Sequence, residues 1–451
     1  MNRTLATSIL AASALAAFAG NTTSFCQNFN DSTLRVDYIF GGGPSGNTVL
    51  LDRQSKTPGW YGKRHHLAEV PLQGNGSIIM TDPVSGDTIY RSSFSSLFQE
   101  WINTPEAETT ARSFENTFLL PLPRGNADIT ITLNDNRHKP IASHRHRYRP
   151  DDELVAIPPK SPYHSEYVHN GGDPANAIDI AMIAEGYTPQ EEATFLEDAR
   201  RMAAEILKYE PFASRKERFN FIAVCVPSAE SGVSVPLEKE WKNTAFGSHY
   251  STFYSSRYLT SPKVKAMHDA LSGLPYEHVM VLVNTERYGG GGIYNSYQMA
   301  ATHNEHSLPV TVHEFGHSFG GLADEYFYSG EEDETYPLDI EPWEPNITTL
   351  VDFSSKWEAM VTPGTPVPTP TEADNLTRDQ KMKKAARKAK KGDGNKKTPS
   401  ETVGAFEGGG YKAKGVYRPV ETCRMRDNYH PVFCPVCETA LASLIDFYTL
   451  P

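Results

Sequence analysis

Short runs in which apolar and polar residues alternate dominate the first third of the chain. Residues 34–40, 77–80 and 129–133 are such runs, and turn segments rich in Gly, Pro, Asn and Asp separate them. Alternation with a period of two is typical of a β-strand that buries one face. We therefore predict an antiparallel β-sandwich domain over residues 20–155, without a recognisable catalytic set of residues.

The pattern changes after residue 176, where strands begin to alternate with helices. Apolar runs and helical spacing predict a strand at 178–184, a helix at 188–207, a strand at 219–226, a helix at 261–271 and a strand at 278–283. Thr188 and Glu191 form a capping box at the start of the first helix. This alternation predicts a mixed α/β domain with a largely parallel sheet over residues 156–451. The chain as a whole is thus expected to be α+β, with its catalytic machinery in the second domain.

The first 19 residues have the pattern of a secretory signal peptide. Arg3 precedes an uncharged apolar run at 5–18, and Ala17-Phe18-Ala19 fits the small-residue cleavage rule. The alternative is a buried N-terminal helix. The run is shorter than the roughly 20 residues that span a bilayer, and no later segment is apolar enough to do so. We expect a secreted or periplasmic protein without stable membrane insertion.

Composition and charge narrow the function further. The chain has 451 residues, of which 39% are hydrophobic and 22% charged, with a formal net charge of −12. An acidic balance argues against a nucleic-acid-binding protein, which needs a basic face. Residues 378–397 carry ten basic and two acidic residues, so the remainder of the chain carries −20. We interpret about 365–400 as a basic, disordered insertion, or alternatively as a contact to an anionic surface or glycan.

The clearest chemical signal is the sequence His313-Glu-Phe-Gly-His317. On a helix, His313 and His317 lie one turn apart, so both imidazoles face a single ion. Glu314 lies beside them and is the candidate general base, which would take a proton from water and pass it to the leaving amine. A zinc ion held there would acidify water and polarise a carbonyl. The motif therefore predicts one catalytic Zn²⁺.

A catalytic zinc needs a third protein ligand. The segment resembles the metzincin pattern, in which the third ligand follows a helix-ending glycine by three residues. Gly321 and Asp324 have that spacing here, so the resemblance implies Asp324 as the ligand. Glu325 is the alternative ligand. Asp324 could instead be a carboxylate that orients one of the histidines.

The C-terminal region adds further candidates. Met425 is the residue that could form the methionine turn which metzincins place beneath the zinc. Cys423, Cys434 and Cys437 could form one disulfide, which we favour in an exported protein, or a structural zinc site together with His430. Cys225 lies in an apolar strand pattern and is expected to be a buried free thiol. The glycine-rich segment 287–297 is either the rim of a substrate cleft or a flexible hairpin.

Taken together, these segments resemble the bacterial IgA-peptidase family of secreted zinc metallopeptidases. The matching segments are spread over residues 178–440, and residues 20–155 look like the family's N-terminal domain. The matching segments are residues 184–188, 226–233, 284–297, 313–326, 404–408, 415–419 and 433–437. The resemblance implies a metzincin-like endopeptidase with His313 and His317 as zinc ligands and Glu314 as the catalytic residue. The basic insertion departs from the family pattern.

Three functions remain open at this point. The first is a zinc endopeptidase that cleaves protein or glycoprotein substrates. The second is a secreted glycoprotein-binding or adhesion protein whose peptidase fold is inert. The third is a zinc enzyme that hydrolyses a non-peptide amide. The intact His-Glu-His set favours the first over the second. We expect a monomer.

Overall fold

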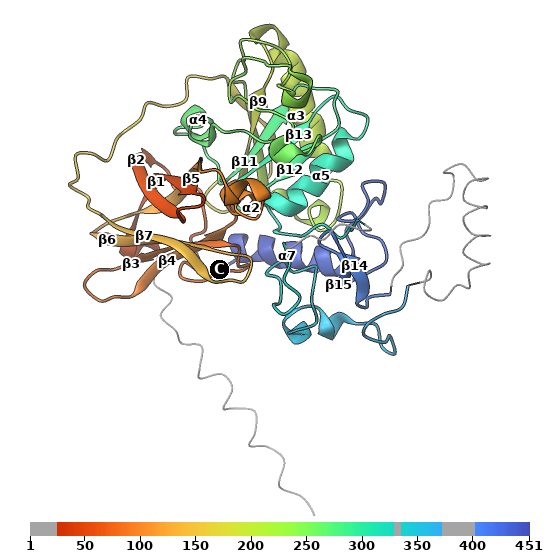
Figure 1. The fold of residues 1–451 in the computed structure, drawn as a ribbon. Helices are drawn as coiled ribbons and strands as arrows, with labels where there is room; N and C mark the ends of the chain where they lie inside the picture. Colours follow the sequence, from red (N-terminus) through yellow and green to blue (C-terminus); the bar gives the residue numbers. More distant parts are fainter. Residues whose placement is uncertain (1–24, 329–334, 372–401) are drawn as a thin grey trace, which may run out of the picture.

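The computed structural model describes residues 25–328, 335–371 and 402–451 (Figure 1). The predicted signal peptide at 1–19 lies outside the described residues, as does most of the predicted basic insertion. The chain is α+β, with a β-rich N-terminal region followed by a region in which strands and helices alternate.

The N-terminal region consists of two antiparallel sheets. One has the strand order β2-β1-β5 and the other the order β4-β3-β6-β7. Their bounds are β1 Phe29–Gly42, β2 Thr48–Pro58, β3 Gly76–Thr81, β4 Thr88–Phe94, β5 Arg112–Pro123, β6 Ala127–Asn134 and β7 Pro140–Tyr148. Both sheets contribute to one apolar core, in which Val36, Ile78 and Ile131 are completely buried. The three predicted strands lie within β1, β3 and β6.

Three short helices accompany these strands. They are α1 Phe25–Asn28, α2 Leu97–Trp101 and the 3₁₀ helix η1 Pro105–Glu108. Ser96 caps α2, because its hydroxyl accepts a hydrogen bond from the Gln99 N–H.

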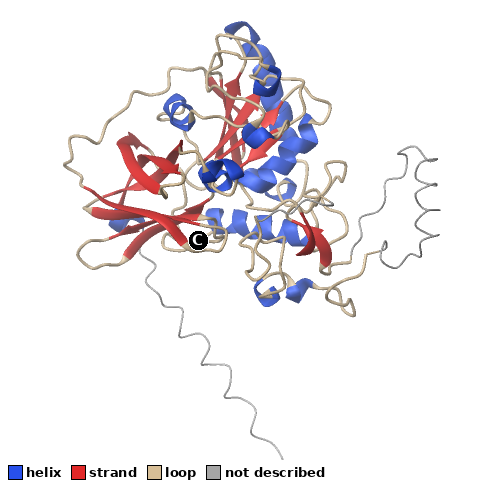
Figure 2. Ribbon diagram, viewed as in Figure 1, coloured by secondary structure: helices blue, strands red, loops and turns tan. Residues whose placement is uncertain are grey.

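The second region is built around a six-stranded sheet of order β12-β13-β11-β9-β10-β8. Helices lie around this sheet (Figure 2). The strands are β8 Ser165–Asn170, β9 Ile178–Glu185, β10 Phe219–Val224, β11 His278–Val283, β12 Gly290–Gly292 and β13 Tyr297–Ala301. The four inner strands pair in parallel, and β8 and β12 pair antiparallel at the two edges. The inner strands are buried along their whole length, as expected for a sheet covered on both faces.

Helices cover both faces of this sheet. The α3, α5 and α7 side chains share one core with Ile180 and Phe221, whereas α4 packs with Ala181 and Val281 on the opposite face. The bounds are α3 Glu192–Ile206, α4 Val264–Ala270, α5 Ser307–Ser318 and α7 Pro435–Thr449. Before α3, the predicted capping box of Thr188 and Glu191 is present.

The remaining elements among the described residues are 3₁₀ helices and a hairpin. They are η2 Pro189–Glu191, η3 Ala213–Arg218, η4 Pro236–Glu238, η5 Thr252–Tyr254, η6 Phe353–Ser355 and η7 Glu358–Met360, with β14 Phe406–Gly409 pairing antiparallel with β15 Lys412–Arg418.

The two regions are joined by specific polar contacts. The Arg35 guanidinium lies 2.6 Å from the Asp269 carboxylate, and the Ser95 N–H donates to the Tyr294 carbonyl at 2.9 Å. The Asn295 amide donates to the Ser93 carbonyl at 2.9 Å. The contacts of Ser93 and Ser95 hold the segment before α2 against the segment that follows β12, where the site described below is found. None of the helices formed by the described residues has the length and hydropathy to cross a membrane.

Candidate catalytic metal centre

Helix α5 presents two histidines on one face. Val312 and Phe315 anchor the helix in the core, and the rings of His313 and His317 project from it with their Nε2 atoms 3.0 Å apart. The Nδ1 atom of His313 lies 3.1 Å from the Arg424 carbonyl, and that of His317 lies 2.5 Å from the Leu322 carbonyl. A carbonyl can only accept, so each Nδ1 carries a hydrogen, and each Nε2 is the ring atom that could bind a cation. Two such nitrogen atoms at this separation favour a proton or a metal ion between them.

Asp324 supplies the third donor. The chain leaves α5 through Gly321, whose φ of +57° lies in the left-handed region and turns the backbone toward the histidines. The Asp324 Oδ1 atom then lies 2.9 Å from His313 Nε2 and 3.3 Å from His317 Nε2. Tetrahedral zinc with nitrogen and oxygen ligands has ligand–ligand edges of about 3.4 Å. The donor set and its dimensions therefore fit a zinc ion.

The pKa shifts of His317 and Asp324 are also compatible with a cation between these side chains. Burial by itself lowers the pKa of His317, but the Asp324 carboxylate, together with Glu314 and the Leu322 carbonyl, raises that pKa to about 9. Burial raises the pKa of Asp324, whereas His317 and His313 lower it to well below its usual range. The Asp324 carboxylate thus favours a positive charge among the three side chains, which a proton or a metal ion can supply.

Glu325 does not join this group. Its carboxylate lies on the other side of the chain, where its Oε1 atom accepts hydrogen bonds from Asn346 Nδ2 at 3.0 Å and from the Cys437 thiol at 3.2 Å. The two neighbouring carboxylates thus lie in different surroundings, and only that of Asp324 faces the histidines.

Glu314 lies beside the three donors in the wall of a cleft of about 780 Å³. Its side chain packs against Gly290, where a Cβ atom would lie 3.0 Å from the Glu314 Oε1 atom. Burial raises the pKa of Glu314, while the neighbouring His313 and His317 act to lower it. A partly buried carboxylate with a raised pKa, next to three side chains that could hold a metal ion, is chemically suited to accept a proton.

The glycine-rich segment 287–297 forms part of the cleft wall. This agrees with the first of its two sequence-based interpretations, a position at the rim of a cleft. However, the outer edge of β12 is not free at Gly290, because the Leu259 N–H donates to the Gly290 carbonyl at 3.2 Å. An extended peptide therefore cannot pair with that position.

Close packing between β12 and α5 gives a testable prediction. A Cβ atom on Gly292 would lie 2.5 Å from the Glu314 carbonyl oxygen and 3.0 Å from the His317 Cβ. We expect Gly292→Ala to push the strand and the helix apart and to lower the free energy of unfolding by about 1–3 kcal/mol, measured by denaturant titration. Gly125→Ala is the matched control, because its Cβ would meet no atom within 4 Å. Equal stabilities of the two variants would contradict the prediction.

Met425 lies directly beneath the histidine motif. It is completely buried, and a Cβ atom on Gly316 would lie 2.7 Å from its Sδ atom. The Met425 carbonyl accepts a hydrogen bond from the Glu325 N–H at 2.8 Å. The methionine thus packs under the helix that carries the two histidines and supports both this helix and the loop that follows it.

The disulfide favoured from the sequence is wrong. All five cysteines are free, and the sulfur atoms of Cys423 and Cys437 are 3.8 Å apart, well beyond the roughly 2.0 Å of an S–S bond. His430 is not part of the group that Cys423, Cys434 and Cys437 form; Glu325 takes that place. Cys225 is a buried free thiol, as predicted.

The N-terminal region contributes to the cleft, which sequence reasoning missed. Glu100, on α2, accepts a hydrogen bond from the Tyr258 hydroxyl at 2.6 Å, and burial raises the pKa of Glu100 to about 7.

Two residues of the second region, Arg257 and Tyr411, also line the cleft, and the Tyr411 hydroxyl donates to Asp324 Oδ2 at 2.5 Å. No local pattern marks these residues, because only packing brings them to the site.

Comparison with known protein families places the chain in one of them. Residues 167–445 match the family described as IgA Peptidase M64, and residues 24–145 match the domain described as Peptidase M64 N-terminus. No individually curated protein matches the sequence. The first match covers more than half of the chain and includes His313, Glu314, His317 and Asp324. The chain therefore belongs to the IgA peptidase M64 family and is a peptidase.

Proposed function

We propose that this protein is an exported zinc-dependent endopeptidase that hydrolyses peptide bonds in protein or glycoprotein substrates. The observation that carries the proposal is the convergence of His313, His317 and Asp324 beside Glu314 in the wall of one large cleft. The donor set suits zinc, and the cleft has room for a segment of polypeptide. Export rests on the sequence pattern of residues 1–19.

The residues divide the chemistry between them. His313, His317 and Asp324 would hold the ion, and the Arg424 and Leu322 carbonyls keep both histidines in the tautomer that binds metal. A zinc ion supplies a Lewis acid that acidifies water and polarises the scissile carbonyl. Glu314 accepts a proton from the attacking water at its carboxylate and returns it to the leaving amine. Glu100 and Tyr258 line one wall of the cleft in which the substrate would lie.

Metal removal tests the proposal. We expect the purified protein to cleave internal bonds in a peptide library, and 1,10-phenanthroline to abolish this cleavage because it removes the ion that activates water. Added Zn²⁺ should restore it, and the non-chelating 1,7-phenanthroline should have no effect. Products identified by mass spectrometry would show whether the hydrolysed bonds are peptide bonds. A zinc-loaded protein that cleaves nothing would favour the glycoprotein-binding alternative instead.

A further inference from the structure

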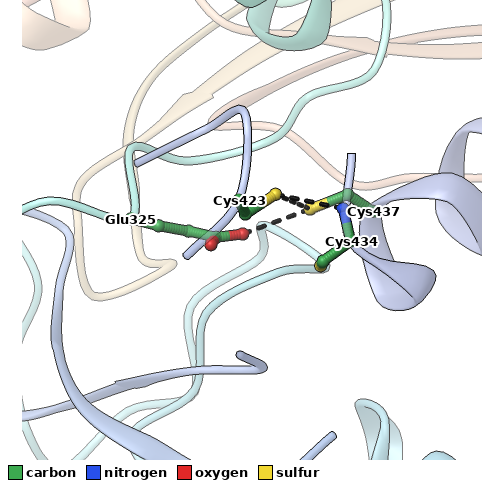
Figure 3. Close-up of side chains that lie close together, drawn as sticks. All are labelled: Glu325, Cys423, Cys434 and Cys437. Carbon is green, nitrogen blue, oxygen red and sulfur yellow. Dashed lines mark hydrogen bonds between the residues drawn. The ribbon is translucent and has the colours of Figure 1, made fainter. Parts of the chain in front are cut away.

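Three thiols and one carboxylate converge in the interior, behind the loop that carries Asp324. They belong to Glu325, Cys423, Cys434 and Cys437, which come from three separate segments of the chain (Figure 3). Their exposed fractions are 4% or less, and one ligand atom from each residue lies within 4.8 Å of those of the others. Neither the family match nor the proposed peptidase chemistry assigns a role to this group.

The protein alone does not supply hydrogen-bond partners for every polar atom of this group. The Glu325 Oε2 atom is buried and has no hydrogen-bond partner among the described residues. Thiols are weak hydrogen-bond donors and acceptors, and an unsatisfied buried carboxyl oxygen costs roughly 1–3 kcal/mol or more. A cation bound between the four side chains would remove this cost.

The dimensions of the group match a thiolate metal site. Tetrahedral zinc with bonds of about 2.3 Å to sulfur gives sulfur–sulfur edges of about 3.8 Å, and Cys423 Sγ lies 3.8 Å from Cys437 Sγ. Cys434 and Cys437 are three residues apart at the N-terminus of α7, which favours negative charge. The Cys434 N–H also donates to Cys423 Sγ at 3.2 Å.

We propose that Glu325, Cys423, Cys434 and Cys437 bind a second, structural Zn²⁺ ion. Thiolate ligands select zinc over magnesium or calcium, and four protein ligands leave no open position for catalysis. Each of the three thiols loses its proton to solvent when the ion binds. One Zn²⁺ with three thiolates and one carboxylate carries a charge of −2. The positive side chains of Arg418 and Arg426 lie close enough to interact with Glu325 and to compensate that charge.

The position of this ion gives it a structural role. It would link the loop after α5 to the Met425 turn and to the start of α7, because its ligands belong to all three. Asp324 and Glu325 are neighbours that face opposite sites, and the Arg424 carbonyl next to Cys423 binds His313. The second ion would therefore hold Asp324 and His313 in position without contacting the substrate.

Metal counting on the full chain, purified under reducing conditions, tests the site separately from the peptidase proposal. We expect the wild type to hold two zinc ions and the double variant His313→Ala, His317→Ala to keep one. After exchange for Co²⁺, that variant should show the charge-transfer absorption of a cobalt–thiolate bond, which a site without cysteine cannot produce. A metal-free double variant, a cobalt spectrum without this band, or a Cys423–Cys437 disulfide in mass spectra would overturn the second site.

The same counts distinguish failure of either proposal. If the wild type holds one ion and the double variant holds none, the catalytic site stands and the structural site is refuted. If the wild type holds one ion and the double variant keeps it, with the cobalt–thiolate band, the structural site stands and the catalytic site is refuted.

A single-cysteine variant provides a matched comparison. We expect Cys437→Ser to lose one of the two ions and to melt at a lower temperature. Cys26→Ser, at an exposed free cysteine, should keep both ions. A soluble, folded Cys437→Ser protein with two ions would overturn the assignment.

Discussion

Glu314→Gln is expected to lower kcat by about 10²–10⁴-fold, the usual contribution of a general acid–base residue, while zinc content stays at the wild-type value. Glutamine keeps the shape of the side chain but cannot accept the proton of the attacking water. The ligands themselves, His313, His317 and Asp324, are unchanged. Activity is measured with a peptide found in the library screen, and zinc by elemental analysis of the same sample.

Glu305→Gln is the control for this substitution, because Glu305 lies just before α5 and its side chain is 84% exposed. It should leave both kcat and zinc content unchanged. Wild-type turnover in a fully zinc-loaded Glu314→Gln protein would show that another group acts as the base.

Asp324→Asn is expected to produce the second large effect, loss of the catalytic ion. If Asp324 is a ligand, zinc binding at this site should weaken by more than the roughly 10–100-fold that follows loss of a supporting residue. Hydrolysis should fall in parallel. Competition with a chromophoric chelator measures the affinity directly and does not depend on turnover.

Tyr411→Phe is the matched variant, because it removes only the hydroxyl that supports Asp324 Oδ2. It should weaken zinc binding by about 10–100-fold. If Asp324→Asn has no larger effect than Tyr411→Phe, Asp324 orients a histidine rather than binding the ion.

Local patterns predicted much of the framework. Strands β9, β10 and β11 were found because a parallel sheet covered on both faces requires continuous apolar runs, and 178–184 and 278–283 are such runs. Strands β2, β4, β5 and β7 were missed. In β2 and β7 most side chains are exposed or only partly buried, so little apolar signal marks them.

The candidate site was predicted in part. His313, Glu314 and His317 lie within five residues on one helix, so helical geometry alone brings them together. Asp324 was inferred from its distance to a turn glycine, and Gly321 does adopt the required left-handed conformation. Glu100 and Arg257 were not found, since they reach the cleft from loops and helices distant in sequence.

The sequence by itself thus determined the local features: the helix with two histidines on one face, the turn that follows it, and the family to which both belong. Only the tertiary structure decided which way each neighbouring carboxylate points. Asp324 faces the histidines, whereas Glu325 faces three cysteines that lie about 100 residues further along the chain. The reason is physical: spacing along a helix is set by backbone hydrogen bonds within the segment, but contacts between distant segments are set by how the whole core packs.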